Sequence, residues 1–114
     1  MEKTCAVTAL AALAQDNRLD VFRLLVQAGP QGMAAGAIAE ALDLPPNTLT
    51  FHFDRLRMAG LVNVRRDGRS MIYAAQFETM NALLGFLTDN CCGGTPCLPA
   101  ATCKPARKRT RLPA

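Results

Sequence analysis

The chain has 114 residues, half of them apolar, which is enough for one compact domain and a tail and excludes a second independent domain. Tryptophan is absent and there is one tyrosine, so aliphatic residues must form most of the core, and a mainly helical fold is expected. The formal net charge of +4 comes from a basic run over residues 104–111, because residues 1–103 carry eight basic and nine acidic side chains.

Four helices are expected in the first part of the chain. A segment rich in alanine and leucine over residues 4–15 predicts the first, and Asp16 offers an N-cap for a second that runs to about Ala28. A third, over residues 34–42, is joined by a tight turn to a fourth that begins at Pro46, where a missing backbone donor costs nothing. Two short helices in this arrangement are typical of a helix-turn-helix motif.

A β-hairpin is expected next. Residues 61–66 and 70–74 are β-prone, and they flank a turn centred on Asp67 and Gly68. A hairpin directly after a helix-turn-helix is typical of the wing of a winged helix. The expected register pairs Arg66 with Arg69, Val64 with Met71 and Val62 with Tyr73.

The fourth helix and the hairpin carry the side chains expected to contact DNA. Residues 54–69 hold five arginines against two aspartates, a local net charge of +3. A solvated polar helix face is the alternative, but a consecutive recognition helix, hairpin and positive charge favour DNA. We expect the helix to reach base edges in the major groove and the hairpin to contact phosphates or the minor groove. The candidate residues are Asn47, Thr48, Thr50, His52 and Arg55 on the helix and Arg65, Arg66 and Arg69 on the hairpin.

A last helix is expected from Phe77 to about Asn90, with a broad apolar face. This face is wider than a peripheral helix on so small a domain needs, so we expect part of it to form a dimer interface. Glycines and prolines then predict a segment without regular structure. The expected organisation is a DNA-binding and dimerisation domain over residues 1–92 and a flexible, basic, cysteine-containing tail over residues 93–114.

Four of the five cysteines lie within residues 91–103, which indicates a site for a soft ion. The chain shows neither a secretory signal nor an apolar run of the roughly 20 residues that span a bilayer, so a cytoplasmic location without a membrane partner is expected. Structural disulfides are disfavoured in that reducing compartment. Cys91 and Cys92, with Cys97 or Cys103 as a third thiolate, match trivalent arsenic or antimony, a soft centre that takes three sulfurs in a pyramid.

Other interpretations of the thiols stay open. Four cysteines can form a tetrahedral zinc site, although adjacent cysteines chelate one ion poorly and the usual CxxC spacing is absent. A redox switch through disulfides needs no ion. Cys5 is expected to be a small buried residue, with a ligand role across a dimer as the alternative. An enzyme such as a thiol-dependent arsenate reductase is not expected, because the cluster follows a helix C-terminus, where the dipole disfavours thiolates.

Taken together, these stretches resemble the ArsR (ArsR/SmtB) family of metalloregulatory winged-helix repressors over nearly all of residues 5–97. The matching stretches are ALAALAQDNRLDVFRLL, LPPNTLTFHFDRLRMAGLV, the RRDGRSMIYAA hairpin and FETMNALLGFLTDNCCGG. The resemblance implies a homodimer through its first and last helices, a pseudo-palindromic operator in double-stranded DNA, and repression relieved by an inducer. It further implies a regulator of arsenical resistance without an organic cofactor or catalytic residues.

The resemblance also bears on the position of the thiols. The founding arsenic sensors carry a CVC-type motif beside the helix-turn-helix, whereas residues 32–44 contain no cysteine here. Related members place a Cys-Cys pair and a third cysteine after the last helix, which Cys91, Cys92 and Cys97 match, with Cys103 as the alternative third ligand. A further subclass uses two thiols and prefers methylated trivalent arsenicals, so methylarsenite stays an alternative inducer to arsenite and antimonite.

Overall fold

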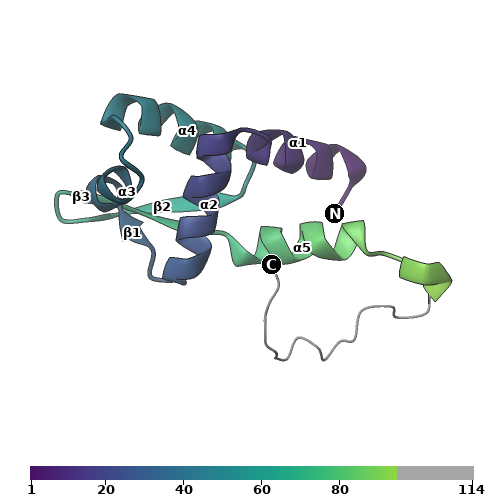
Figure 1. Cartoon of the computed structure of the whole chain (residues 1–114). Helices are drawn as coiled ribbons and strands as arrows, with labels where there is room; N and C mark the ends of the chain where they lie inside the picture. The colour runs from purple at the N-terminus through teal and green to yellow at the C-terminus, as the bar shows by residue number, and fades with distance from the viewer. Residues whose placement is uncertain (95–114) are drawn as a thin grey trace, which may run out of the picture.

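A computed structural model describes residues 1–94 of the chain, which form helices around a small antiparallel sheet (Figure 1). The helices are α1 (Lys3–Leu13), α2 (Asp16–Ala28), α3 (Ala35–Leu42), α4 (Pro46–Met58) and α5 (Phe77–Leu87). The strands are β1 (Met33–Ala34), β2 (Val62–Asp67) and β3 (Ser70–Ala75), and a 3-10 turn, η1 (Cys91–Gly94), follows α5. The predicted mainly helical fold, with a helix-turn-helix and a hairpin wing, is confirmed.

The helices begin and end close to the predicted residues, with one change in a cap. The N-cap of α2 is Gln15, whose side-chain oxygen accepts a hydrogen bond from the backbone nitrogen of Arg18 at 2.9 Å. Asp16 is instead the first residue of the helix, where its negative charge is favourable at the positive end of the helix dipole. α4 begins at Pro46, as predicted, and Asp43, which caps the C-terminus of α3, adopts the left-handed conformation.

The sheet has three strands in the order β1-β3-β2, of which the two-residue strand β1 was not predicted. β1 pairs Met33 with Tyr73 and Ala34 with Ile72. Gly32, directly before β1, has a φ of +74°, and a Cβ at this position would clash with the backbone carbonyl of Tyr73. A glycine is therefore required for the chain to approach β3 so closely.

The hairpin between β2 and β3 has a different register from the predicted one. Asp67 pairs with Ser70, so the two-residue loop consists of Gly68 and Arg69. Gly68 has a φ of +65° at the first loop position, where two-residue loops of type II′ need glycine. The expected pairs Arg66–Arg69, Val64–Met71 and Val62–Tyr73 are wrong, and the strands instead pair Arg66 with Met71, Val64 with Tyr73 and Val62 with Ala75.

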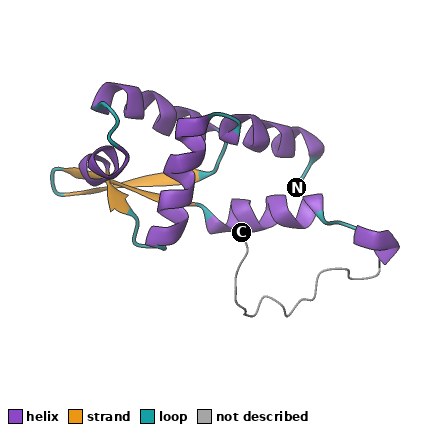
Figure 2. Cartoon of the chain, in the orientation of Figure 1, coloured by secondary structure: helices purple, strands orange, loops and turns teal. Residues whose placement is uncertain are grey.

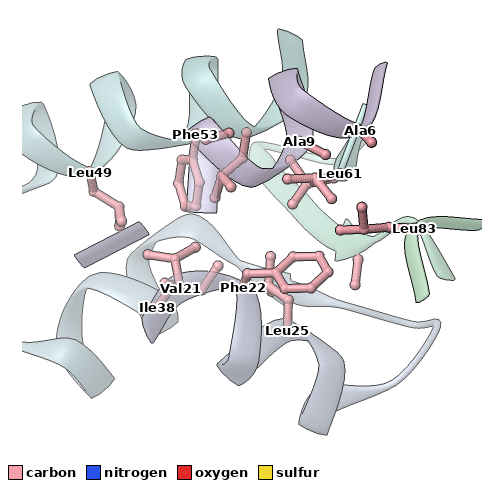
Figure 3. Close-up of a cluster of buried hydrophobic side chains, with 14 residues drawn as sticks. Ala6, Ala9, Val21, Phe22, Leu25, Ile38, Leu49, Phe53, Leu61 and Leu83 are labelled. Atoms are coloured by element: carbon pink, nitrogen blue, oxygen red, sulfur yellow. The ribbon is translucent and has the colours of Figure 1, made fainter. Parts of the chain in front are cut away.

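The core lies where α1, α2 and α4 meet the sheet, and Figure 3 shows its main side chains. Leu25, Ile38 and Leu61 are fully buried, as an aliphatic core predicts. Phe53 stacks on Tyr73 of β3 with the ring centres 3.7 Å apart, which fixes α4 against the hairpin. The helix-turn-helix and the wing therefore form one packed unit.

α5 extends from the sheet beside α1, at the end of the molecule away from the hairpin loop (Figure 2). It ends at Leu87 rather than near Asn90, and Asn90 adopts the left-handed conformation with a φ of +57°. Cys91 and Cys92 therefore lie beyond the helix, in η1, and not on its last turn. None of the helices within residues 1–94 is long and apolar enough to cross a membrane. Cys97, Cys103 and the basic run over residues 104–111 lie outside the described residues.

Candidate nucleic-acid interface and thiol pair

The side of α4 that faces away from the core carries most of the predicted base-contacting residues. Asn47, Thr50 and Arg55 are exposed, and Thr48 is half-buried. Two local hydrogen bonds fix the polar groups of the first turn: Asn47 Oδ1 accepts from the Thr48 backbone nitrogen at 3.0 Å, and Thr50 Oγ1 donates to the Pro46 carbonyl at 3.0 Å. These side chains are thus held close to the helix start, which is the part of a recognition helix that meets base edges.

His52 does not belong to this exposed face, so its predicted contact with DNA is wrong. The residue is 5% exposed, and neither imidazole nitrogen has a hydrogen-bond partner among residues 1–94. Burial and the positive charge of Arg18 lower the pKa of the imidazole, so the ring is neutral at pH 7. The helical spacing indicates that His52 is buried, because position 52 lies within one turn of the buried Leu49 and Leu56.

Phe51 was not predicted to lie on this surface, and it is 53% exposed. Its side chain points away from the core because the flanking stripe, Leu49 and Phe53, is buried. The guanidinium carbon of Arg55 lies 5.1 Å from the centre of the Phe51 ring, which is a cation–π contact. α4 therefore presents an aromatic ring and an arginine together, beside the polar residues that were predicted.

The three arginines of the hairpin are all exposed, as predicted. Arg65 Nη2 donates a hydrogen bond to the Gln31 carbonyl at 3.0 Å, and Arg66 Nε donates to the Gly68 carbonyl at 3.4 Å. Arg69 lies in the loop itself. Figure 1 shows this loop at the same end of the molecule as the start of α4.

The thiols of Cys91 and Cys92 are neighbours in η1, with Cys91 Sγ and Cys92 Sγ 3.7 Å apart. Cys5 is exposed on α1, so the expectation that it is buried is wrong. It lines a cavity of about 360 Å³ together with Glu78 and Thr79 of α5. Residues 1–94 contain no group of three or more cysteine, histidine or acidic side chains that could hold a metal ion. A site of three thiolates would thus need a cysteine from outside the described residues.

A single residue, Gln76, joins the hairpin to α5. Its backbone nitrogen donates to the Leu61 carbonyl at 2.8 Å, and its side-chain oxygen accepts from Asn63 Nδ2 at 2.9 Å. Leu61 is fully buried and directly precedes β2. The first turn of α5 is therefore attached to the strand that carries Arg65 and Arg66.

Comparisons with known proteins agree with this geometry. Residues 13–65 match the family model of a helix-turn-helix domain. The chain is 32% identical over 77 residues to an HTH-type transcriptional regulator, YceK, of Bacillus subtilis, covering 67% of this chain and 76% of the relative. The fold is similar to that of reduced HlyU from Vibrio cholerae, with a TM-score of 0.61, 27% identity, and coverage of 78% of this chain and 90% of that structure.

A second solved structure is the homodimeric winged helix-turn-helix DNA-binding domain of a possible ArsR-family transcriptional regulator from Mycobacterium bovis. It has a TM-score of 0.62 and 28% identity, and the match covers 76% of this chain and 81% of that one. The recognition helix, the wing and these relatives lead to the same assignment. The chain belongs to the helix-turn-helix transcriptional regulators that bind DNA, and its winged-helix fold matches that of the possible ArsR-family regulator from M. bovis.

Proposed function

We propose that the protein is a dimeric repressor that leaves its operator when trivalent arsenic binds the thiolates of Cys91 and Cys92. The distance of 3.7 Å between the two sulfurs carries this proposal, because one thiophilic centre can contact both at that separation. Cys97 or Cys103, outside the described residues, would supply the third thiolate. Arsenite is the proposed inducer, and antimonite is its nearest chemical relative.

The proposed dimer is formed through α1 and α5. α1 buries only alanines in the core of its own chain, and α5 buries only Leu83. Four of their larger apolar side chains are 41–58% exposed, namely Val7, Leu10, Leu84 and Leu87. Apolar surface on two contacting helices is what an interface between identical copies needs. The relative from M. bovis is homodimeric.

In the proposed complex, the two α4 helices enter successive major grooves about one helical turn apart. Asn47, Thr48, Thr50 and Arg55 would contact base edges there, while Arg65, Arg66 and Arg69 contact phosphates beside them. The ion pair between Arg57 and Asp54, at 3.6 Å, leaves Arg55 as the cation of α4 that is available for DNA. The result is a positive surface on one side of each protomer.

Arsenic would act on this complex through α5. Binding would tie η1 to the following segment, directly beyond the helix that helps to set the dimer geometry. Because Gln76 attaches α5 to Leu61 and Asn63, a shift of α5 would also move the hairpin. Couplings between two ligands of one protein are typically about 1–3 kcal/mol, which would weaken operator binding about 5- to 150-fold.

The proposal is tested by titrating the full chain with arsenite while ultraviolet thiolate absorption and operator release are followed together. Both signals should appear in the wild type and in the matched control Cys5→Ser, and both should be lost in the Cys91→Ser, Cys92→Ser double mutant. The single variants Cys97→Ser and Cys103→Ser are then compared. The variant with the weaker thiolate absorption identifies the third ligand. A full arsenite response in the double mutant would refute the site.

The same pair of sulfurs favours a second candidate, a thiol redox-sensing regulator. Two neighbouring thiols can form a disulfide as a peroxide takes up their two electrons and two protons and is reduced to water or alcohol. The V. cholerae relative was solved in a form described as reduced. Operator release by peroxide without arsenite, reversed by dithiothreitol, would favour this function over arsenic sensing.

Methylarsenite is a further inducer to compare, because it needs only two thiolates. The Cys97→Ser, Cys103→Ser double mutant retains the Cys91–Cys92 pair and separates the two arsenicals. If methylarsenite releases the operator from this variant and arsenite does not, Cys91 and Cys92 are sufficient to bind methylarsenite, and arsenite needs a third thiolate. If both fail, a third thiolate is needed for either ligand.

A further inference from the structure

We infer that Phe51 reads a thymine of the operator by contact with its C5-methyl group, and that Arg55 holds the ring in position. The inference rests on the proposed binding of α4 in a major groove, and it identifies one base that α4 contacts there. Its starting point is a large aromatic side chain that is 53% exposed on the helix surface, with the Arg55 guanidinium 5.1 Å from its ring centre.

Phe51 occupies the middle of the exposed face of α4. Thr50 marks the edge toward the hairpin, where it lines a cavity of about 200 Å³ with Met71 of β3. Arg55 marks the edge toward α1, where it lines a cavity of about 390 Å³ with Val7. Phe51 lines neither of these two cavities and is 53% exposed, so its ring lies on the surface between the two edges.

The chemistry of the major groove favours thymine as the partner of this ring. Among the four bases, thymine alone presents an apolar group in that groove, its C5-methyl, and phenylalanine is one of the residues that contact it. Asn47 lies one helical turn before Phe51, and asparagine is the residue type that pairs with adenine. The two side chains together predict a half-site that contains A·T pairs.

Arg55 acts here as a positioning residue. A cation over the ring face restrains the ring to fewer conformations, so less conformational freedom is lost when the ring is ordered on DNA. Asp54 pairs with Arg57 at 3.6 Å, so it does not compete with the ring for Arg55, and the proposed contact of the guanidinium with a base edge is an additional role. The Phe51–Arg55 pair is therefore arranged before the operator binds.

The test removes one methyl group at a time. An operator is first selected from a random duplex library with the full chain, and each thymine is then replaced by deoxyuridine, which lacks only the C5-methyl. The wild type should bind about fourfold more weakly when the contacted thymine of one half-site is replaced, and about 16-fold more weakly when both are, since each substitution removes one buried methyl. Phe51→Ala should bind the two duplexes equally.

Three further variants make the test specific. Phe51→Leu should keep part of the discrimination because it keeps an apolar contact. Arg55→Leu should lower the discrimination by up to about twofold, the factor that corresponds to an exposed cation–π contact of about 0.5 kcal/mol. Met58→Ala, on the same helix but lining the cavity beside Val7, should keep all of it. Thermal unfolding should be unchanged in Phe51→Ala, because the ring is exposed.

The outcomes separate the inference from the proposed function. Sequence-specific binding with no thymine sensitive to deoxyuridine, or with the same sensitive thymine in Phe51→Ala, would overturn the inference and leave the DNA-binding function standing. Failure of the wild type to select any duplex would overturn both. Loss of sensitivity in Phe51→Ala together with its retention in Met58→Ala would establish the contact.

Discussion

The side-chain oxygen of Gln76 accepts a hydrogen bond from Asn63 Nδ2 at 2.9 Å, joining the residue before α5 to strand β2. Asn63 lies two positions before Arg65, and Gln76 directly precedes Phe77, the first residue of α5. The hairpin that is proposed to contact phosphates and the helix that is proposed to respond to arsenic are thus linked through one pair of amides. This link makes the coupling between the two sites testable.

Replacing Asn63 by alanine should weaken the coupling while leaving both ligands able to bind. Residues along a connecting network change such couplings by about 0.5–2 kcal/mol, so the factor by which arsenite weakens operator binding should fall about 2- to 30-fold. The measurement is operator affinity by fluorescence anisotropy with and without saturating arsenite. Asn81→Ala, an exposed amide on α5, is the matched control. An unchanged factor in Asn63→Ala would show that coupling does not pass through this pair.

The hairpin arginines should contribute to affinity mainly through phosphate contacts. Arg66→Ala with Arg69→Ala would remove up to four such contacts from a dimer. Each contact contributes about 0.9 to the slope of log affinity against log salt, so the slope should become shallower by up to about 3.6. Lys3→Ala, at the start of α1, should leave the slope unchanged, because Figure 1 shows α1 away from the hairpin loop. Equal slopes in the wild type and the double variant would place the hairpin away from the DNA backbone.

His52 should make the protein less stable as the pH falls. Its pKa is lowered by burial and by Arg18, so below the ordinary value of 6.5 the unfolded chain takes up a proton that the folded chain resists. The free energy of unfolding should therefore decrease as the pH falls from 6.5 through the lowered folded value, with no such contribution at pH 7.5.

The variant His52→Leu isolates this effect. It should lack the loss of stability below pH 6.5 and be about 1 kcal/mol more stable at pH 7.5, because it removes two buried nitrogens that have no hydrogen-bond partner within residues 1–94. Urea unfolding at pH 5.5, 6.5 and 7.5 measures both quantities. Operator affinity should be unchanged in this variant. A loss of operator affinity without a loss of stability would show that His52 does contact DNA.

Gly32→Ala should destabilise the fold by about 3 kcal/mol, because it combines a positive φ with a clash against the Tyr73 backbone. Gly36→Ala is its matched control, since a Cβ there meets nothing within 4 Å. Gly36 lies inside α3, so alanine should stabilise by about 0.5–1 kcal/mol through helix propensity. Thermal unfolding of both variants decides the point, and equal effects would contradict the close approach of β1 to β3.

Patterns that are local in the chain made the fold predictable. Pro46 at a helix start and the buried spacing of Leu49, Phe53 and Leu56 identified α4 from neighbouring residues alone. β1 has two residues, too few for a periodic pattern, and it forms only because Met33 meets Tyr73 forty residues later. Pairing between residues so far apart in the chain cannot be predicted from the local sequence.

The functional surface was predictable in part. The predicted hairpin register was wrong because Asp67-Gly68 and Gly68-Arg69 are both acceptable two-residue loops. The structure has the second, which places Val64 opposite Tyr73. His52 was predicted to be exposed because it is polar, and the exposure of Phe51 was not predicted because phenylalanine is apolar. Both errors concern the same helix, where periodicity decides which residues are exposed.

Reciprocal linkage tests the central claim most directly. If arsenic capture beyond α5 and operator binding by α4 are coupled, the operator must weaken arsenite binding by the same factor, about 5- to 150-fold, by which arsenite weakens operator binding. The measurement is a titration of arsenite by thiolate absorption, with the full chain alone and with saturating operator. Equal factors in both directions are predicted. Arsenite that binds equally tightly with and without operator would contradict the account.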